Sequence, residues 1–151
     1  MAPEKLYLTQ VPPQSSMVTV LFICIHNAGR SQMAEAFFNQ LSDGRHRGIS
    51  AGSKPTEEIN PVVVEAMWEV GVDISGNKPK KLTKEMVLEA ELAITMGCGE
   101  EACPVVPNEL REWQIEDPQG KPIEVVRIIR DEVQNRVKDL VKELDESHST
   151  I

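Results

Sequence analysis

The chain has 151 residues, with 16 Lys and Arg against 24 Asp and Glu, and a formal net charge of −8 at pH 7. This length is typical of one domain that buries a sizeable core. The acidic balance without a basic patch argues against a nucleic-acid partner, and no stretch approaches the roughly 20 apolar residues of a membrane span. No basic segment precedes the longest apolar run, so we expect no export signal, no membrane partner and a cytoplasmic location.

Three segments are expected along the chain. Residues 1–16 contain three prolines and a Gln-Ser-Ser stretch, which is typical of a flexible leader. Residues 17–146 carry the alternating apolar patterns of a folded domain, and residues 147–151 are expected to form a tail.

The first part of this domain predicts a strand, a helix and a second strand. The run "VTVLFI", residues 18–23, is almost continuously apolar, which is the pattern of a strand buried on both faces. From Ser31 onward apolar residues recur every four positions up to Asp43-Gly44, which predicts a helix with a defined end. The stretch "RGISAG", residues 47–52, predicts a short second strand.

Two helices and two strands are expected in the second part. Asn60-Pro61 predicts the start of a helix, residues 82–91 predict a short one, and "LAITM", residues 92–96, predicts a third strand. A short strand is expected near Trp113. The last helix is expected over about residues 122–145, with one apolar stripe formed by Val126, Ile129, Val133, Val137, Leu140 and Leu144.

Because strands alternate with helices, the sequence predicts an α/β fold. We expect a three-layer sandwich with a central, mostly parallel four-stranded sheet between helices. Ligands of such sheets bind in loops at the carboxyl ends of the strands. Cys24, Cys98 and Cys103 each come after a predicted strand, so they could meet at one edge of the sheet.

The loop "CIHNAGRS", residues 24–31, has the composition of an oxyanion site. Its backbone N–H groups and the following helix N-terminus form an anion cradle, and Gly29 permits a tight backbone. The Arg30 guanidinium can hold two oxygens of a tetrahedral oxyanion. The same positive field stabilises a Cys24 thiolate, and Ser31 can donate a hydrogen bond to that thiolate or cap the helix. The predicted oxyanion-binding set is Cys24, Ile25, His26, Asn27, Ala28, Gly29 and Arg30.

The alternative for this loop is a buried cysteine that merely packs beside a surface arginine. Packing alone requires neither Gly29 nor the Arg30-Ser31 pair, so the oxyanion interpretation is favoured.

The stretch "VLFICIHNAGRSQMAEAFF" resembles the opening of the low-molecular-weight tyrosine phosphatase fold, and more closely the arsenate reductases built on that fold. The segments "SAGSKP", "TMGCGEEACPVVP" and "EDPQGKPIEVVRIIRDEV" agree in the expected order, so the resemblance covers nearly all of residues 18–144. It implies that Cys24 is the nucleophile, Ser31 stabilises its thiolate, Arg30 binds the oxyanion and Asp117 is the general acid.

The stretch "EDPQG", residues 116–120, is turn chemistry and by itself fits a surface turn equally well. Next to a bound anion, charge repulsion favours the protonated carboxyl that a general acid needs. Glu116 is the competing carboxylate. No aromatic residue follows Pro118, which argues against an aryl phosphate substrate.

The other two cysteines favour reduction over phosphate hydrolysis. The resemblance implies that Cys98 attacks the sulfur of an arsenic-bound Cys24, and that Cys103 then attacks Cys98. It also implies that this reaction serves arsenic detoxification. Four residues separate Cys98 from Cys103, fewer than in the best-known thioredoxin-coupled reductases but similar to mycothiol-dependent ones. The spacing leaves the electron donor open. Thioredoxin is the first expected donor, and a small thiol such as mycothiol is the second.

We expect no tightly bound cofactor and no metal in the catalytic set. Zinc usually takes four ligands, and the three histidines show no paired spacing with the cysteines. Some members of the resembled family bind potassium near the loop, and the matching oxygen donors here are Asn27, Glu35, Ser50 and Asp73. Both tryptophans, Trp68 and Trp113, are expected to pack in the core.

Two other functions stay open. The first is a low-molecular-weight tyrosine phosphatase that acts through a phosphocysteine, with Cys98 and Cys103 spare. The second is a non-catalytic oxyanion sensor, which the complete set of Cys24, Arg30 and Asp117 disfavours. Phosphate and sulfate are expected to compete with arsenate, because all three are tetrahedral oxyanions.

Overall fold

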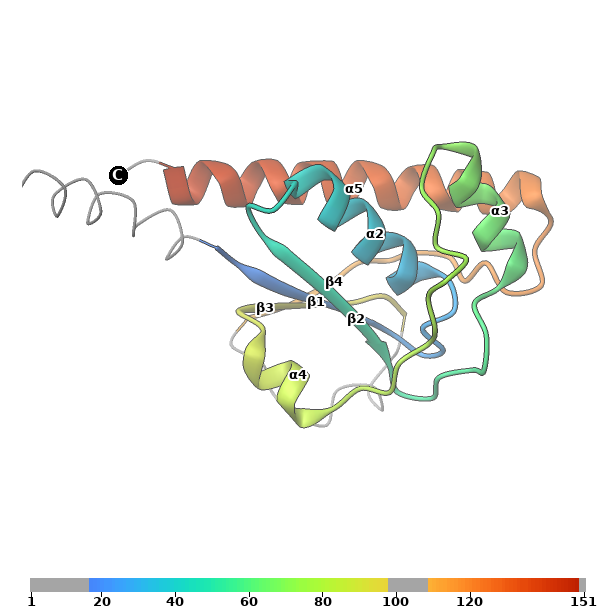
Figure 1. Cartoon of the computed structure of the whole chain (residues 1–151), viewed down its shortest axis with the longest axis horizontal. Helices are drawn as coiled ribbons and strands as arrows, with labels where there is room; N and C mark the ends of the chain where they lie inside the picture. Colours follow the sequence, from blue (N-terminus) through green and yellow to red (C-terminus); the bar gives the residue numbers. More distant parts are fainter. Residues whose placement is uncertain (1–16, 98–108, 150–151) are drawn as a thin grey trace, which may run out of the picture.

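A computed structural model describes residues 17–97 and 109–149 of the chain (Figure 1). Its four strands form one sheet in the order β2-β1-β3-β4, and every neighbouring pair is parallel. The strands are β1 (Thr19–Cys24), β2 (Arg47–Gly52), β3 (Leu92–Thr95) and β4 (Leu110–Glu112). The predicted strands are therefore confirmed, and the sheet is parallel throughout the described residues.

Helices cover both faces of the sheet, which confirms the predicted three layers (Figure 1). The helices are α2 (Arg30–Ser42), α3 (Pro61–Glu69), α4 (Lys84–Glu89) and α5 (Ile123–Ser149). Helices α2, α3 and α5 lie on one face and α4 on the other. Alternate residues of β1 serve both faces, since Phe22 belongs to the larger apolar cluster while Leu21 and Ile23 belong to the smaller one.

The helix ends follow the expected capping chemistry, with one exception. The Asn60 Oδ1 accepts a hydrogen bond from the Val62 N–H at 2.9 Å, and Thr83 caps α4 in the same way. Helix α2 instead starts after Gly29 and has no side-chain cap. Its first N–H groups therefore stay available for a ligand.

The two tryptophans differ in their environment. Trp113 is buried and its ring centroid lies 6.0 Å from that of Phe22, which confirms the packing role predicted for it. Trp68 is 66% exposed, so the packing prediction for this residue is wrong. Helix α3 turns Val63 and Met67 to the core, and the position after Met67 is rotated by about 100° toward solvent.

A buried histidine joins the end of α5 to the start of the sheet. The Val18 N–H donates to His46 Nδ1 at 3.2 Å, so the hydrogen on His46 Nε2 is directed to Asp145 Oδ1 at 3.0 Å. Arg45 donates two more hydrogen bonds to the same carboxylate, at 3.1 and 2.9 Å. The hydrogen bonds from Arg45, and then that from His46, hold the pKa of Asp145 below its ordinary value of 3.8.

The C-terminal helix is longer than the sequence predicts. Helix α5 continues to Ser149 rather than ending near Asp145, while the expected leader, residues 1–16, lies outside the described residues. Within residues 17–97 and 109–149, no helix has both the length and the apolar character needed to cross a bilayer.

We expect Asp145→Asn to lower the free energy of unfolding at neutral pH by about 1 kcal/mol, because it removes the charge that Arg45 and His46 contact. A carboxyl with a lowered folded-state pKa stabilises the fold above its unfolded-state pKa and loses that effect as the pH falls through the folded-state value. The difference between variant and parent should therefore shrink below about pH 3.8. Urea unfolding from pH 7 down to pH 2.5 measures it, and a constant difference would contradict the role of this carboxylate.

Candidate active site

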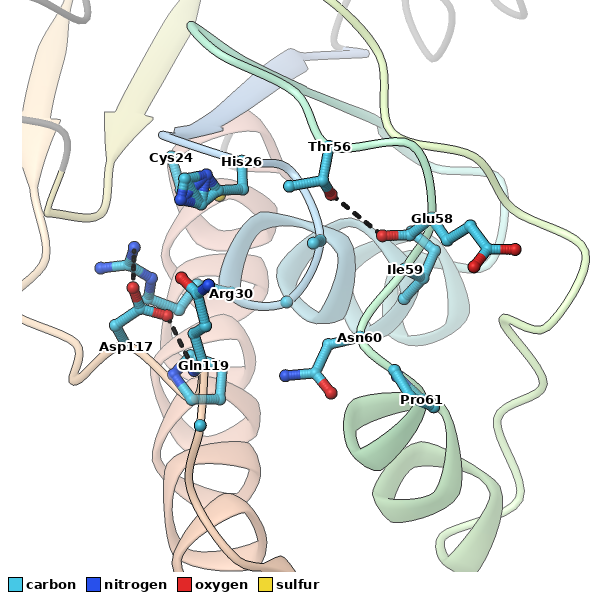
Figure 2. Close-up of a pocket in the computed structure, with 14 residues that line it drawn as sticks. Cys24, His26, Arg30, Thr56, Glu58, Ile59, Asn60, Pro61, Asp117 and Gln119 are labelled. Carbon is cyan, nitrogen blue, oxygen red and sulfur yellow. Dashed lines mark hydrogen bonds and ion pairs between the residues drawn. The ribbon is translucent and has the colours of Figure 1, made fainter.

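The loop between β1 and α2 lines one side of a cavity of about 360 Å³ (Figure 2). Cys24 ends β1 at the bottom of this cavity and is 2% exposed. The other walls come from residues 56–61 and from the loop 117–120 that precedes α5. The loop thus lies at the carboxyl edge of the sheet, as the sequence predicts.

The carbonyl groups of the loop are turned outward by the segment after β2. The carbonyl oxygens of Ile25, His26 and Ala28 accept N–H groups of residues 54, 56 and 60, at 2.8, 3.2 and 2.9 Å. In a trans peptide the next N–H points the opposite way from each carbonyl. This pattern directs loop N–H groups toward the inside of the cradle, where they can bind an anion.

Gly52 at the end of β2 makes this close approach feasible. A Cβ at this position would lie 2.6 Å from the Ile25 carbonyl oxygen and 2.9 Å from the Asn27 nitrogen. A residue with a side chain would therefore push the loop off the sheet.

The Ser31 hydroxyl is fixed on the Cys24 sulfur. The Ser31 Oγ lies 2.8 Å from Cys24 Sγ and accepts a hydrogen bond from Asn27 Nδ2 at 2.7 Å. Since the amide is the donor in that bond, the hydroxyl hydrogen is free to point at the sulfur. This arrangement stabilises a thiolate, and it answers the choice left open by the sequence, because Ser31 does not cap α2.

Arg30 and Asp117 lie beside each other at the cavity (Figure 2). Arg30 Nη2 lies 3.6 Å from Asp117 Oδ2, and the side chains are 6% and 47% exposed. Arg30 Nη1 also donates to the Ile115 carbonyl at 3.3 Å, which holds the guanidinium in place. An arriving oxyanion would compete with Asp117 for Arg30 and leave the carboxylate beside a second negative charge.

The competing carboxylate does not reach the cavity. Glu116 is exposed and pairs with Lys121, its Oε2 being 3.5 Å from Nζ. Asp117 instead accepts the Gln119 N–H at 3.0 Å, which fixes the turn of the loop. Of the two carboxylates, Asp117 therefore has the geometry for a general acid.

The structure brings together Cys24, Arg30, Ser31 and Asp117 from the predicted catalytic set. The loop residues of the predicted oxyanion set line or frame the same cradle. His26 lines the cavity, and its Nδ1 is buried without a hydrogen-bond partner among the described residues. The predicted relay residues Cys98 and Cys103 lie outside the described residues, so their roles stay predictions.

Besides Gly52, sequence reasoning missed a second glycine that shapes the site, Gly97 after β3. Its φ is +76°, and a Cβ there would overlap the Arg30 Nη1. The signal that could have pointed to it is its position in the sequence, directly after the strand β3, which pairs with β1 in the sheet. Gly97 therefore gives the guanidinium its space.

The four donors suggested for potassium do not converge on one ion. Asn27 turns its Nδ2, not its oxygen, toward Ser50 Oγ at 3.0 Å. Asp73 accepts hydrogen bonds within its own turn, from the nitrogen and hydroxyl of Ser75. An ammonium group, that of Lys80, lies 3.2 Å from Glu35 Oε1 and 3.4 Å from Ser50 Oγ. The donor set does not fit a potassium site.

The fold and this site define a known family. Residues 19–150 match the family described as low molecular weight phosphotyrosine protein phosphatase, and the chain belongs to this family.

Within that family the chain is similar to arsenate reductases, which confirms the resemblance seen in the sequence. A glutaredoxin arsenate reductase from Synechocystis sp. (strain ATCC 27184 / PCC 6803 / Kazusa) is 34% identical over 131 residues, which are 85% of this chain and 99% of that protein. The structure of a thioredoxin-dependent arsenate reductase from Corynebacterium glutamicum is 39% identical with a TM-score of 0.75, covering 87% of this chain. This chain spans 63% of that protein, less than two thirds of its length.

A third similarity includes a bound-anion state. A solved arsenate reductase described as being in the phosphate binding state is 32% identical, with a TM-score of 0.74, covering 85% of this chain and 99% of that one. The predicted fold class is thereby confirmed, since these structures share the architecture described above.

We expect Gly97→Ala to raise the dissociation constant for phosphate, used as the probe oxyanion, at least 10-fold, because the added methyl displaces the Arg30 guanidinium. Gly71→Ala is the matched control, since Gly71 also has positive φ, +83°, but no atom within 4 Å of its added Cβ. Both variants should lose about 1 kcal/mol of stability from backbone strain. Isothermal titration calorimetry measures the affinity, and equal losses of affinity in both variants would refute the specific contact.

Proposed function

We propose that this protein is a cytoplasmic arsenate reductase that converts arsenate to arsenite in arsenic detoxification. The observation that carries the proposal is the hydrogen-bonded Cys24–Ser31 pair, with its sulfur at the bottom of an anion cradle that Arg30 and Asp117 complete. The similarity to proteins named arsenate reductases supports the choice of arsenate among oxyanions.

The first step uses the described residues. Arsenate binds the loop N–H groups and Arg30, and the Cys24 thiolate attacks arsenic. Asp117, released from Arg30 and placed beside the anion, gives a proton to the departing oxygen, which leaves as water. The product of this step is a covalent Cys24–arsenic(V) adduct.

The second step completes the reduction. A Cys98 thiolate attacks the Cys24 sulfur, forming a disulfide and breaking the sulfur–arsenic bond, so that the bonding electron pair stays on arsenic and arsenite departs. Cys103 then attacks Cys98, which frees Cys24 and leaves a Cys98–Cys103 disulfide. Two thiols are oxidised for each arsenic(V) reduced to arsenic(III), so the electrons balance.

The position of β3 supports this relay. Thr95 of β3 is the register partner of Ile23, one residue before Cys24, and Gly97 lies against the Arg30 guanidinium. Cys98 follows Gly97 directly in the sequence.

The electron donor proposed first is a thioredoxin-type protein, and a small thiol such as mycothiol is second. The names of two similar proteins specify thioredoxin in one case and glutaredoxin in the other, so both use a thiol protein. No organic cofactor is needed, because the two electrons come from cysteine sulfur.

Phosphatase activity is the second candidate, since the same nucleophile, cation and acid would transfer a phosphoryl group. One feature disfavours aryl phosphates in particular. Among the described residues that line the cavity there is no Phe, Tyr or Trp to hold a phenyl ring.

A free-thiol count tests the proposed reaction. The protein is fully reduced, freed of reductant and given one equivalent of arsenate, then alkylated and mapped by peptide mass. We expect two thiols to disappear, a Cys98–Cys103 disulfide to form and one equivalent of arsenite to be released. Cys103→Ser should stop at a Cys24–Cys98 disulfide, and Cys98→Ser should keep both remaining thiols free.

Three free thiols after this treatment would refute the internal relay. Adding mycothiol or thioredoxin with its reductase then separates the alternatives. Arsenite that appears only with the external thiol assigns the reduction to that thiol, whereas hydrolysis of phosphate esters without any arsenite assigns a phosphatase.

We expect Asp117→Asn to lower kcat for arsenate reduction about 10²- to 10³-fold, because the departing oxygen loses its proton donor. Glu116→Gln is the control, since that exposed carboxylate pairs with Lys121 and should change kcat less than 2-fold. Steady-state kinetics with a thioredoxin-coupled assay measure both variants. Equal effects of the two substitutions would remove Asp117 from the role of acid.

A further inference from the structure

A network of hydrogen bonds extends from Cys24 to a lysine ammonium on the far side of the loop. Asn27 Nδ2 donates to Ser31 Oγ at 2.7 Å and to Ser50 Oγ at 3.0 Å. Ser50 Oγ donates to the Glu35 carboxylate, and Lys80 Nζ contacts that carboxylate at 3.2 Å.

The direction of every bond in this network is fixed. The Asn27 Oδ1 accepts the backbone N–H of Lys80 at 2.8 Å and the Gln32 Nε2 at 2.9 Å, both of which are donors. The Asn27 Nδ2 therefore faces the two hydroxyls and donates to each. Each hydroxyl hydrogen must then point away from Asn27, that of Ser50 toward Glu35 and that of Ser31 toward the Cys24 sulfur.

The charges at the far end decide how this network affects the sulfur. The Glu35 side chain is only 21% exposed, and among the described residues its ion pair is with Lys80. A negative charge in this partly buried position opposes a second one on Cys24, while the ammonium cancels it. Lys80 also supplies the backbone N–H that fixes the Asn27 amide, so one residue sets both charge and orientation.

We propose that Lys80 is a positioning residue for Cys24. Its ammonium acts as a built-in counterion that neutralises Glu35 and so removes the opposition of that carboxylate to the Cys24 thiolate, with Ser50, Asn27 and Ser31 linking the pair to the sulfur. The inference rests on Cys24 being the proposed nucleophile, but it does not depend on which oxyanion the protein reduces or hydrolyses. Neither residue touches the cavity, so both act through the loop rather than on the substrate.

The test measures the thiolate directly. In a background carrying Cys98→Ser and Cys103→Ser, Cys24 is the sole thiol, and its alkylation rate with iodoacetamide is followed from pH 5 to pH 10. Lys80→Met, Glu35→Gln, their combination and Lys80→Arg are compared with this parent. Lys81→Met is the matched control, because the Lys81 Nζ contacts the Ser53 carbonyl at 3.0 Å and not the network.

The charge model predicts opposite effects for the two single variants. At pH 7, Lys80→Met should slow alkylation about 3- to 10-fold, because it leaves the carboxylate uncompensated. Glu35→Gln should match or exceed the parent rate. The double variant and Lys80→Arg should return to within 2-fold of the parent, and Lys81→Met should not differ from it.

The remaining titratable side chains around Cys24 are identical in all variants. They are His26 of the loop, Arg30 of α2, Glu58 of the segment after β2 and Asp117 of the loop before α5. Any difference in the pH profile therefore comes from the Lys80–Glu35 pair.

Two results would overturn the inference. One is a Lys80→Met profile equal to that of Lys81→Met, and the other is a double variant as slow as Lys80→Met, which would indicate a structural role of the lysine alone. Urea unfolding of each variant shows that it is folded. If the protein does not reduce arsenate but the alkylation rates follow the expected pattern, the proposed function is refuted and this inference still holds.

Discussion

The hydrogen-bonded amide of Asn27 is the interaction on which the site depends. The residue takes a left-handed φ of 53°, which asparagine tolerates better than most residues, and its side chain is fully buried. Its oxygen accepts two hydrogen bonds and its nitrogen donates two, so the amide is saturated. Through these bonds one side chain joins the loop to α2, to β2 and to the segment before α4.

The parallel sheet explains why such a junction is available. Strands β1 and β2 end together, with Cys24 and Gly52 in register, and β3 ends beside β1. Chain segments leaving these strands therefore meet at one edge, where Cys24, the space for Arg30 and the anchor of the loop are assembled. The opposite edge carries the structural contacts, such as that of His46 with the end of α5.

The parts of this structure that could be predicted are those that depend on residues close together in the sequence. The continuous apolar run of β1 and the stripe of α5 each reflect one burial pattern, and Cys24, Arg30 and Ser31 lie within one short loop. Asp117 lies far from this loop in the sequence. Only the resemblance of the chain to a known family predicts that it belongs to the site. Trp68 was misjudged because an apolar residue on a short helix does not reveal which face turns to the core.

The Lys80–Glu35 pair is a part of the site that could not be predicted from local sequence. Its members, together with Ser50 and Asn27, come from four separate segments, and each alone has the composition of a solvated surface. Only the strand order and the exact hydrogen-bond directions reveal that they form one array. The same holds for Gly97. Only the position of the Arg30 side chain shows why no side chain can be present at residue 97.

The depth of Cys24 in the molecule limits which molecules can reach its sulfur. Because only 2% of Cys24 is exposed, a sulfur carried on the broad surface of another folded protein cannot make a straight approach to it. Such a recess protects the sulfur from mixed disulfides with large proteins. In the proposed reaction, a large electron donor would therefore act through a smaller intermediate.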